Sequence, residues 1–251
     1  MTRCILDPVE NPLFLFAQCK AYHPLETVIK DCEALIAERP TETTRVYLSA
    51  PHSFIKELSK KFSSLGVLIG AEEMPPTDEG AFTVDISDKV LAQEEAQFVL
   101  IGTPQDRALC LLKGHSLQSK CTTALKGKIP PFICLAETWQ EHEDGLSKQI
   151  LSQQLKAVVE GIPVEELKGL HIIYNAVWIN DSLWKVTEEI LEKSYIAFKE
   201  VVEETLDPSI HGSLHLIPAV PTRCEKLSEI ASIMQRPSYA FAGLSLGTIR
   251  S

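Results

Sequence analysis

Polar residues that directly follow short apolar runs are the first places to look for chemistry in this chain. The nearly continuous apolar run 98–101 opens onto the polar segment 102–107 (GTPQDR), as a buried parallel strand that ends at a functional loop would. Lys20 follows the apolar run 13–19, and Asn175 lies within a third run. A lysine amine can stabilise an anionic group or form a Schiff base with a carbonyl substrate. We favour the alternative that Lys20 is a solvated residue without a chemical role.

Carboxylates and histidines offer weaker candidates. Glu72 and Glu73 end the run 66–71 and could form an acid pair, but we interpret them as solvated loop carboxylates, which is the commoner case. The seven histidines lack HxxxH or HxH spacing, and His211 and His215 are separated by Gly212 and a strand-like run. We therefore expect neither a metal site nor a bound cofactor.

Eight apolar runs of strand length alternate with segments that carry apolar residues at helical spacing. Val28, Cys32, Leu35 and Ile36, for example, form a stripe on one face of the predicted helix 25–39. This alternation indicates a parallel sheet, and eight units in 251 residues favour a closed (β/α)8 barrel forming one domain, 1–251. The predicted strands are 13–19, 45–49, 66–71, 97–102, 130–135, 170–177, 213–219 and 238–243. The other predicted helices are 53–64, 87–95, 105–125, 144–160, 184–206 and 223–235.

Several short motifs, in the same order and at the same spacing, resemble those of the triosephosphate isomerase family. The resemblance covers nearly the whole chain and implies a TIM barrel. The matching segments, each followed by the family motif, are 18–22 (QCKAY; NWKMN), 50–51 (AP; AP), 80–87 (GAFTVDIS; GAFTGEIS), 102–107 (GTPQDR; GHSERR), 134–137 (CLAE; CIGE), 173–178 (IYNAVW; AYEPVW) and 242–246 (AGLSL; GGASL).

The resemblance implies a catalytic site whose two central residues are replaced. Family members use a glutamate as base and a neutral histidine as electrophile under a closing loop. The glutamate position holds Asn175, which cannot accept a proton at useful pH, and the histidine position holds Thr103, which is too short to reach the same oxygen. The family lysine is retained as Lys20. The neighbouring asparagine is replaced by Gln18 and the loop acid by Gln105, so we expect the surrounding polar shell to have changed as well.

The loops that hold phosphate in the family have also lost their glycines. The loop 179–184 contains no glycine, its Asp181 would repel a phosphate, and the segment 217–219 carries a proline that removes an amide donor. A cradle of backbone amides needs the close approach that glycines allow. We expect phosphate affinity to be weak or absent, with residual ligand contacts at the positions matching the family site: Gln18, Arg107, Ser182, Gly243 and Ser245.

Composition excludes several other classes of protein. The formal net charge of −10 and the lack of a basic patch disfavour binding to nucleic acid. The seven cysteines form an odd number without CxxC spacing, which favours buried thiols in a reducing compartment. No uncharged apolar run reaches the length of a membrane-spanning helix of about 18 residues. We expect a soluble intracellular protein, in the cytoplasm or an organellar matrix, without membrane insertion.

Departures at both ends and in one loop point to a protein partner. The chain ends about eight residues after Gly243, so the final barrel helix is predicted to be missing or a single turn, which would leave an apolar groove. An N-terminal extension, 1–12, could cover part of that groove, but it has little apolar surface, so we favour another chain. The loop 73–79 has the length of the family's dimer loop without its residues, which leaves a homodimer possible.

Three functional hypotheses follow. The leading one is a pseudoenzyme of the triosephosphate isomerase family whose barrel serves as a binding, scaffold or assembly subunit. The second is an active triosephosphate isomerase, or a related sugar-phosphate isomerase, that uses relocated catalytic groups. The third is a lyase that forms a Schiff base through Lys20. The joint replacement of base, electrophile and phosphate glycines favours the first.

Overall fold

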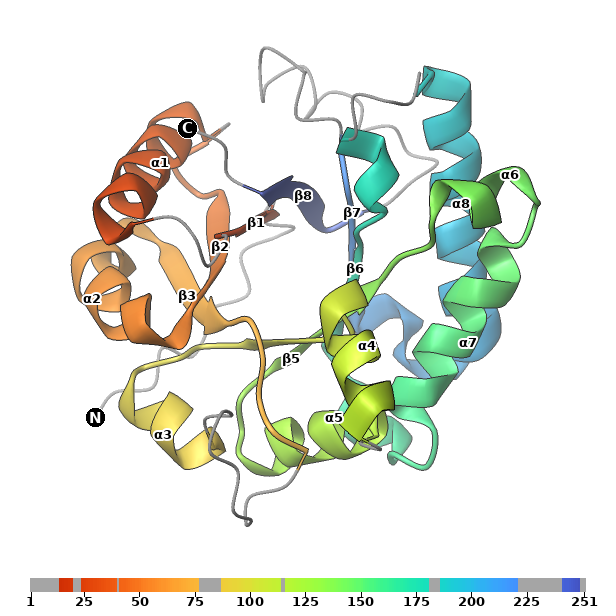
Figure 1. The fold of residues 1–251 in the computed structure, drawn as a ribbon, viewed down its shortest axis with the longest axis horizontal. Helices are drawn as coiled ribbons and strands as arrows, with labels where there is room; N and C mark the ends of the chain where they lie inside the picture. The colour runs from red at the N-terminus through yellow and green to blue at the C-terminus, as the bar shows by residue number, and fades with distance from the viewer. Residues whose placement is uncertain are drawn as a thin grey trace.

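A closed barrel of eight parallel strands forms the centre of the molecule (Figure 1). The computed structural model describes residues 14–19, 24–39, 41–76, 87–113, 116–180, 186–220 and 241–248. The strand order is β7-β6-β5-β4-β3-β2-β1-β8, and Ala219 and Ser245 bridge the two ends of that order. The strands are β1 Phe14–Gln18, β2 Arg45–Ala50, β3 Val67–Ala71, β4 Val99–Ile101, β5 Pro131–Leu135, β6 His171–Tyr174, β7 His215–Pro218 and β8 Gly243–Thr248. The predicted (β/α)8 barrel is confirmed.

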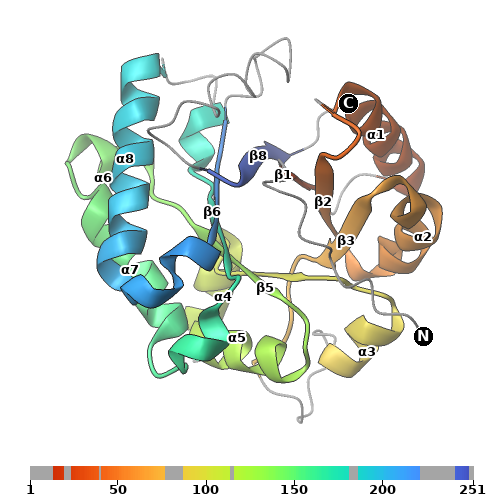
Figure 2. The same ribbon diagram turned by 180° about the vertical axis from the view of Figure 1, so that it is seen from behind.

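Helices surround this barrel, and Figure 2 shows the same ring from behind, with α7 and α8 side by side. The predicted stripe on α1 is confirmed, because Val28, Cys32 and Leu35 are buried. The α-helices are α1 Leu25–Glu38, α2 His52–Phe62, α3 Asp88–Gln93, α4 Pro104–Lys113, α5 Leu117–Lys126, α6 Trp139–Glu143, α7 Ser147–Val159 and α8 Glu188–Thr205. Short 3-10 helices are η1 Ser63–Leu65, η2 Val164–Leu167, η3 Val177–Asn180 and η4 Pro208–Ser213. No helix among these is long and apolar enough to cross a lipid bilayer.

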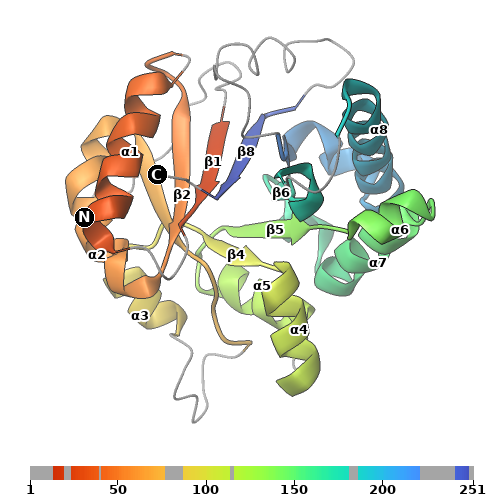
Figure 3. The same cartoon turned by 45° about the horizontal axis from the view of Figure 1, so that its top comes forward.

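Two predicted elements differ in the structure. The single predicted helix 105–125 is divided into α4 and α5, and Ser116 caps the second of them by accepting the Ser119 N–H. The last strand begins at Gly243, where the sequence predicted it to end, because its pairing with β1 runs from Phe14 with Gly243 to Gln18 with Thr248. Figure 3 shows β8 beside β1. The N-terminal extension 1–12, the predicted helix 223–235, the motif 80–86 and the residues after 248 lie outside the described part of the chain.

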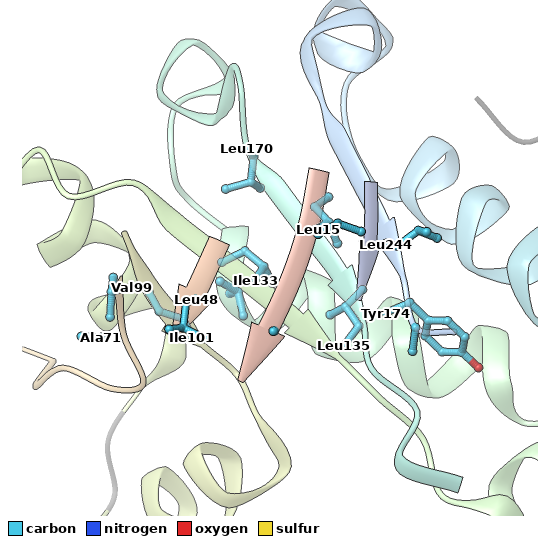
Figure 4. Close-up of a cluster of buried hydrophobic side chains, with 14 of the residues drawn as sticks. Leu15, Leu48, Ala71, Val99, Ile101, Ile133, Leu135, Leu170, Tyr174 and Leu244 are labelled. Atoms are coloured by element: carbon cyan, nitrogen blue, oxygen red, sulfur yellow. The ribbon is translucent and has the colours of Figure 1, made fainter. Parts of the chain in front are cut away.

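Alternation along the strands produces two apolar layers. In β1, Leu15 and Ala17 belong to the larger layer between strands and helices, part of which is drawn in Figure 4. Phe14 and Phe16 belong to a second, separate cluster, which is rich in rings and which we place inside the barrel. This interior cluster consists of Phe14, Phe16, Tyr47, Phe98, Leu100, Phe132, Ile173 and Ile217.

Gly70 in β3 leaves the space that one of these rings occupies. A Cβ atom at Gly70 would lie 2.5 Å from the Phe98 ring. Gly70→Ala is therefore expected to destabilise the protein by about 1–3 kcal/mol, the usual cost of overpacking a core, measured by chemical denaturation. Gly212→Ala is the control, because a Cβ there meets nothing within 4 Å. The double variant Gly70→Ala/Phe98→Leu should recover part of the loss. Equal stability of the Gly70 and Gly212 variants would show that the ring does not need this space.

His171, the first residue of β6, lies against the interior rings as a neutral base. Its ring stacks on Phe132 with centroids 4.1 Å apart and an interplanar angle of 7°, and the His215 ring is 4.4 Å away. Both ring nitrogens are buried without a hydrogen bond of normal geometry to any described residue. Burial, followed by the proximity of His215, lowers the pKa of His171 to about 3, and only the Gly169 backbone opposes this.

Acid is therefore expected to destabilise the barrel through His171. Below its ordinary pKa of about 6.5 the unfolded chain takes up a proton that native His171 refuses, so stability falls between about pH 6.5 and pH 3. The loss attributable to this residue has an upper limit of about 5 kcal/mol. His171→Phe should flatten the pH dependence of the free energy of unfolding, whereas the exposed His52→Gln should not. Parallel curves for His171→Phe and the unchanged protein would contradict this.

Candidate functional site

The candidate site lies at the mouth, meaning the end of the barrel where the strands finish. Gln18 is the last residue of β1, Thr103 follows β4 and Asn175 follows β6, so the structure brings these three predicted positions to one end of the barrel. The Asn175 N–H continues the sheet by donating to the Leu135 carbonyl at 2.8 Å. Lys20 and Ser182, which were also predicted, lie outside the described residues.

Thr103, at the position where the family has its histidine, caps a helix. Its Oγ1 accepts the Asp106 N–H at 3.1 Å, and its carbonyl accepts the Arg107 N–H at 2.9 Å. Pro104 is the first residue of α4, a position that needs no amide hydrogen. With 7% of its surface exposed, the Thr103 side chain belongs to the first turn of α4. It provides no imidazole for an electrophilic role.

Asn175, at the position where the family has its base, is half-buried beside the end of β5. Its side chain can donate and accept hydrogen bonds, but an amide has no ionisation in the range needed to remove a proton from carbon. The pair Thr103 and Asn175 thus offers a helix-capping hydroxyl and an amide at the mouth. It cannot carry out the two steps of a proton transfer between adjacent carbons.

A buried ion-pair network that sequence reasoning missed lies directly behind the loop. Lys120 Nζ, on α5, is 2.5 Å from Asp106 Oδ1 and 2.9 Å from Glu73 Oε1, and the other Asp106 oxygen accepts the Gly102 N–H at 2.8 Å. Lys120 and Asp106 are each only 2% exposed. Burial favours a lower pKa for Lys120, but Asp106 and Glu73 outweigh it and raise the pKa, so the amine stays charged.

This network corrects two predictions. The loop acid is not lost with Gln105, because an acid one residue later, Asp106, fixes the same loop. Glu73 is not simply a solvated loop carboxylate, because its side chain is 35% exposed and paired with a buried lysine. The sequence feature that could have revealed this network is a charged residue among buried neighbours on α5. Lys120 is flanked there by the buried Cys121, Thr123 and Ala124.

Arg107 is directed at the backbone. Its guanidinium donates to the carbonyl of Gly102, to that of Cys134 at 3.0 Å and to that of Ala136 at 3.4 Å. Burial lowers the pKa of Arg107, although nearby Cys134, Asp106 and Glu141 act in the opposite direction. Arg107 therefore ties the ends of β4 and β5 together, and its predicted role as a ligand contact gains no support from this arrangement.

Gly243 does not lie at the mouth loops. Gly243 pairs with Phe14, the first residue of β1, and a Cβ at Gly243 would lie 2.4 Å from the Phe14 carbonyl oxygen. Because Gly243 has no side chain, β1 and β8 can approach each other closely at the end of the barrel opposite the mouth. Ser245 is fully buried in the middle of β8, opposite Phe16. Ser245 also pairs with Ala219, just after the end of β7, so the register of β8 separates only Gly243 from the predicted phosphate loops.

Glu137 is the ionisable group at the mouth that sequence reasoning used only as part of a motif. Its side chain is fully buried, and Oε1 accepts the Tyr174 hydroxyl at 2.5 Å and the Ser147 hydroxyl at 3.4 Å. Burial raises the pKa of Glu137, while the Tyr174 and Ser147 hydrogen bonds oppose this shift. Tyr174 directly precedes Asn175 in the sequence, but the Tyr174 side chain belongs to the layer between strands and helices, so Glu137 lies on the outer side of β6.

The cysteines and the metal prediction add little chemistry. Cys19, Cys32, Cys110, Cys121 and Cys134 are buried free thiols, as predicted. Burial is the main cause that raises the pKa of Cys32 and of Cys121 to about 12, so these thiols are unreactive near neutral pH. In the part of the chain that the structure describes, no group of three or more His, Cys, Asp or Glu side chains could hold a metal ion.

Comparisons with known proteins agree with this fold. The family model described as triosephosphate isomerase matches residues 13–217. Triosephosphate isomerase of Protochlamydia amoebophila is 28% identical over 173 residues, which cover 69% of this chain and 66% of that protein. The same enzyme of Alkaliphilus metalliredigens is 24% identical over 206 residues, 82% of this chain and 83% of that protein. Triosephosphate isomerase of Francisella tularensis subsp. mediasiatica is 23% identical over 225 residues, which cover 89% of this chain and 88% of that protein. The chain therefore belongs to the triosephosphate isomerase family.

Proposed function

We propose that this chain has lost triosephosphate isomerase activity and serves as a binding, scaffold or assembly subunit. The observation that carries the proposal is the pair of residues at the mouth, Thr103 after β4 and Asn175 after β6. Isomerising a hydroxyketone to a hydroxyaldehyde needs a base that moves a proton between adjacent carbons and a donor that stabilises the enediolate oxygen. The Thr103 hydroxyl caps α4, and Asn175 has no basic group.

An active isomerase with relocated groups is the second candidate, and Glu137 is the observation that favours it. Burial raises the pKa of this carboxyl, which accepts the Tyr174 hydroxyl, and carboxyls with a perturbed pKa are candidates for a general base. Its side chain, however, is fully buried and accepts two hydroxyl hydrogen bonds, so a substrate carbon has no access to it in this arrangement. Glu137→Gln separates the candidates, because it would abolish activity only if Glu137 were the base.

Weak binding of phosphorylated trioses is the expected consequence, and ligand-induced stabilisation tests it. A ligand present at about 100 times its Kd raises the free energy of unfolding by about 2.7 kcal/mol. Dihydroxyacetone phosphate and inorganic phosphate are expected to give less than about 0.3 kcal/mol at millimolar concentration, because Arg107 is bound to backbone carbonyls and Gly243 lies at the far end of the barrel. A ligand concentration of about 30 times Kd would stabilise the protein by about 2 kcal/mol. A stabilisation of that size or more that disappears in Lys20→Ala would show a retained phosphate site.

The assembly part of the proposal is tested by the mass of the native particle. We propose that the chain works as part of a larger protein assembly inside the cell, because its mouth retains polar groups without the paired base and electrophile. Sedimentation of the protein from its own cells is expected to give a larger mass than the recombinant chain at equal concentration. Identical monomer or homodimer masses in both samples would contradict an assembly role while leaving the loss of activity intact.

A further inference from the structure

The loop after β5 and the start of α7 bring together a serine, a histidine and a buried carboxylate. Ser147 Oγ is 3.3 Å from His142 Nδ1 and 3.4 Å from Glu137 Oε1, and Nδ1 is 3.8 Å from the same Glu137 oxygen. The His142 side chain is 17% exposed and Ser147 is half-buried, so both reach solvent, whereas the Glu137 side chain is fully buried behind them. A hydroxyl hydrogen rotates freely, so Ser147 can donate to either partner.

Aromatic side chains lie beside His142, and two polar atoms near them lack a hydrogen-bond partner among the described residues. The His142 ring lies 4.7 Å from the Trp178 ring and 5.6 Å from the Trp139 ring, measured between centroids. Trp178 Nε1 and Glu137 Oε2 are buried, and neither has a hydrogen-bond partner among the described residues. Glu137 and Trp178 are 3% and 2% exposed. Buried polar atoms are normally paired, and each of these two atoms still has the capacity for one hydrogen bond.

Acyl transfer also needs a base, which His142 supplies, and donors that stabilise an oxyanion, which α7 supplies. Burial lowers the pKa of His142, with Glu143 opposing the shift, so the imidazole is a neutral base at neutral pH. With its proton on Nε2, the Nδ1 atom accepts from Ser147. Ser147 is the first residue of α7, a helix of 13 residues whose N-terminus has no side-chain cap. The first-turn amides of Lys148 and Gln149 have no acceptor within the helix and carry its positive dipole end.

We propose that Ser147 and His142 form a nucleophile and base pair that transfers acyl groups from small aryl esters. Ser147 Oγ attacks the ester carbonyl carbon while its proton passes to His142 Nδ1, and the first-turn amides of α7 stabilise the oxyanion. Collapse breaks the bond to the phenol, which takes the proton from His142 and leaves. Water, deprotonated by the same nitrogen, then cleaves the acyl-serine to release the acid and restore the hydroxyl. This activity uses neither Thr103 nor Asn175.

Covalent labelling with a fluorophosphonate tests the pair. The serine oxygen displaces fluoride from phosphorus, His142 takes the proton, and the adduct is located by peptide mass spectrometry. We expect the label on Ser147 and none in Ser147→Ala. His142→Gln should slow labelling by about 10²-fold or more, the usual contribution of a general base. Ser152→Ala is the matched control on the same helix, because the Ser152 hydroxyl hydrogen-bonds Thr205 and is expected to be irrelevant to labelling.

The pH profile separates a base from a structural histidine. The labelling rate should rise with pH through a pKa below the ordinary value of about 6.5 and then stay level, and this step should vanish in His142→Gln. Hydrolysis of p-nitrophenyl acetate should follow the same pH profile. Circular dichroism and thermal unfolding confirm that each variant is folded. Labelling of Ser147 no faster than that of Ser152, or a rate unchanged in folded His142→Gln, would show that the three side chains are only a structural hydrogen-bond network.

Discussion

Turnover of glyceraldehyde 3-phosphate by the purified chain is expected to be on the order of 10⁵-fold below that of an ordinary family enzyme. Loss of a general base costs about 10²–10⁴-fold, and loss of a preorganised oxyanion donor costs about 10²–10³-fold. Both apply here, because Asn175 is not a base and the Thr103 hydroxyl caps α4. The measurement is a coupled steady-state assay on protein produced in a host that lacks its own isomerase. Turnover of several per second would contradict the proposed loss of activity.

Restoring the two family residues is not expected to restore the enzyme. Thr103→His removes the hydroxyl that accepts the Asp106 N–H, at a cost of about 1 kcal/mol in helix capping. Asn175→Glu supplies a base, but the guanidinium of Arg107 remains bound to three backbone carbonyls, and the phosphate-holding glycines of the family remain absent from 179–184 and 217–219. The double variant should stay more than about 10²-fold below an ordinary family enzyme, since positioning alone contributes that much. Recovery to within tenfold would show that the mouth kept its binding geometry.

Lys120→Met is expected to cost about 3–5 kcal/mol of folding free energy. The substitution keeps most of the apolar stem but leaves the Asp106 carboxylate buried at 2% exposure, with the Gly102 amide and the weak Cys110 thiol as its remaining donors. Denaturation by urea at neutral pH measures the change. Because Asp106 also fixes Gly102, the loop after β4 should become more accessible to hydrogen exchange.

Lys148→Met is the matched control for this experiment. Lys148 also contacts two acids, Glu200 at 2.5 Å and Glu204 at 3.6 Å, but all three side chains lie in solvent on α7 and α8. Exposed ion pairs contribute little, so we expect almost no change in stability. The double variant Lys120→Met/Asp106→Leu should recover part of the loss, because a charge no longer remains buried alone. A Lys120 variant as stable as the Lys148 variant would mean that Asp106 and Glu73 are solvated in solution.

The sequence predicted the barrel and the two replaced positions because both depend on local patterns. Apolar runs identify β4 and β6, and Thr103 and Asn175 directly follow them. The Lys120 network could not be found in this way, because its partners Glu73 and Asp106 lie 47 and 14 residues away and meet only after the barrel closes. Gly243 was misplaced for a related reason. The register of β8 is set by its pairing with β1, and a short sequence motif gives no information about that pairing.

Aromatic packing inside the barrel was equally invisible in the sequence. Phe98 and Phe132 stack with centroids 4.4 Å apart although they belong to different strand regions, and Gly70 provides the space beside Phe98. Apolar alternation shows that such residues are buried, but it does not say which of the two layers receives them. The proximity of Ser147, His142 and Glu137 likewise arises from the turn between β5 and α7, where no strand or helix period applies.

Exchange of substrate hydrogen with deuterated water measures the first chemical step most directly, because it requires only that a protein base remove a proton from carbon. Dihydroxyacetone phosphate is incubated with the purified chain in deuterated water and followed by proton NMR. The proposed loss of the base at Asn175 predicts exchange no faster than in buffer at any protein concentration. Exchange that increases in proportion to protein concentration and is abolished by Glu137→Gln or Lys20→Ala would contradict it, and would identify this barrel as an isomerase with a relocated base.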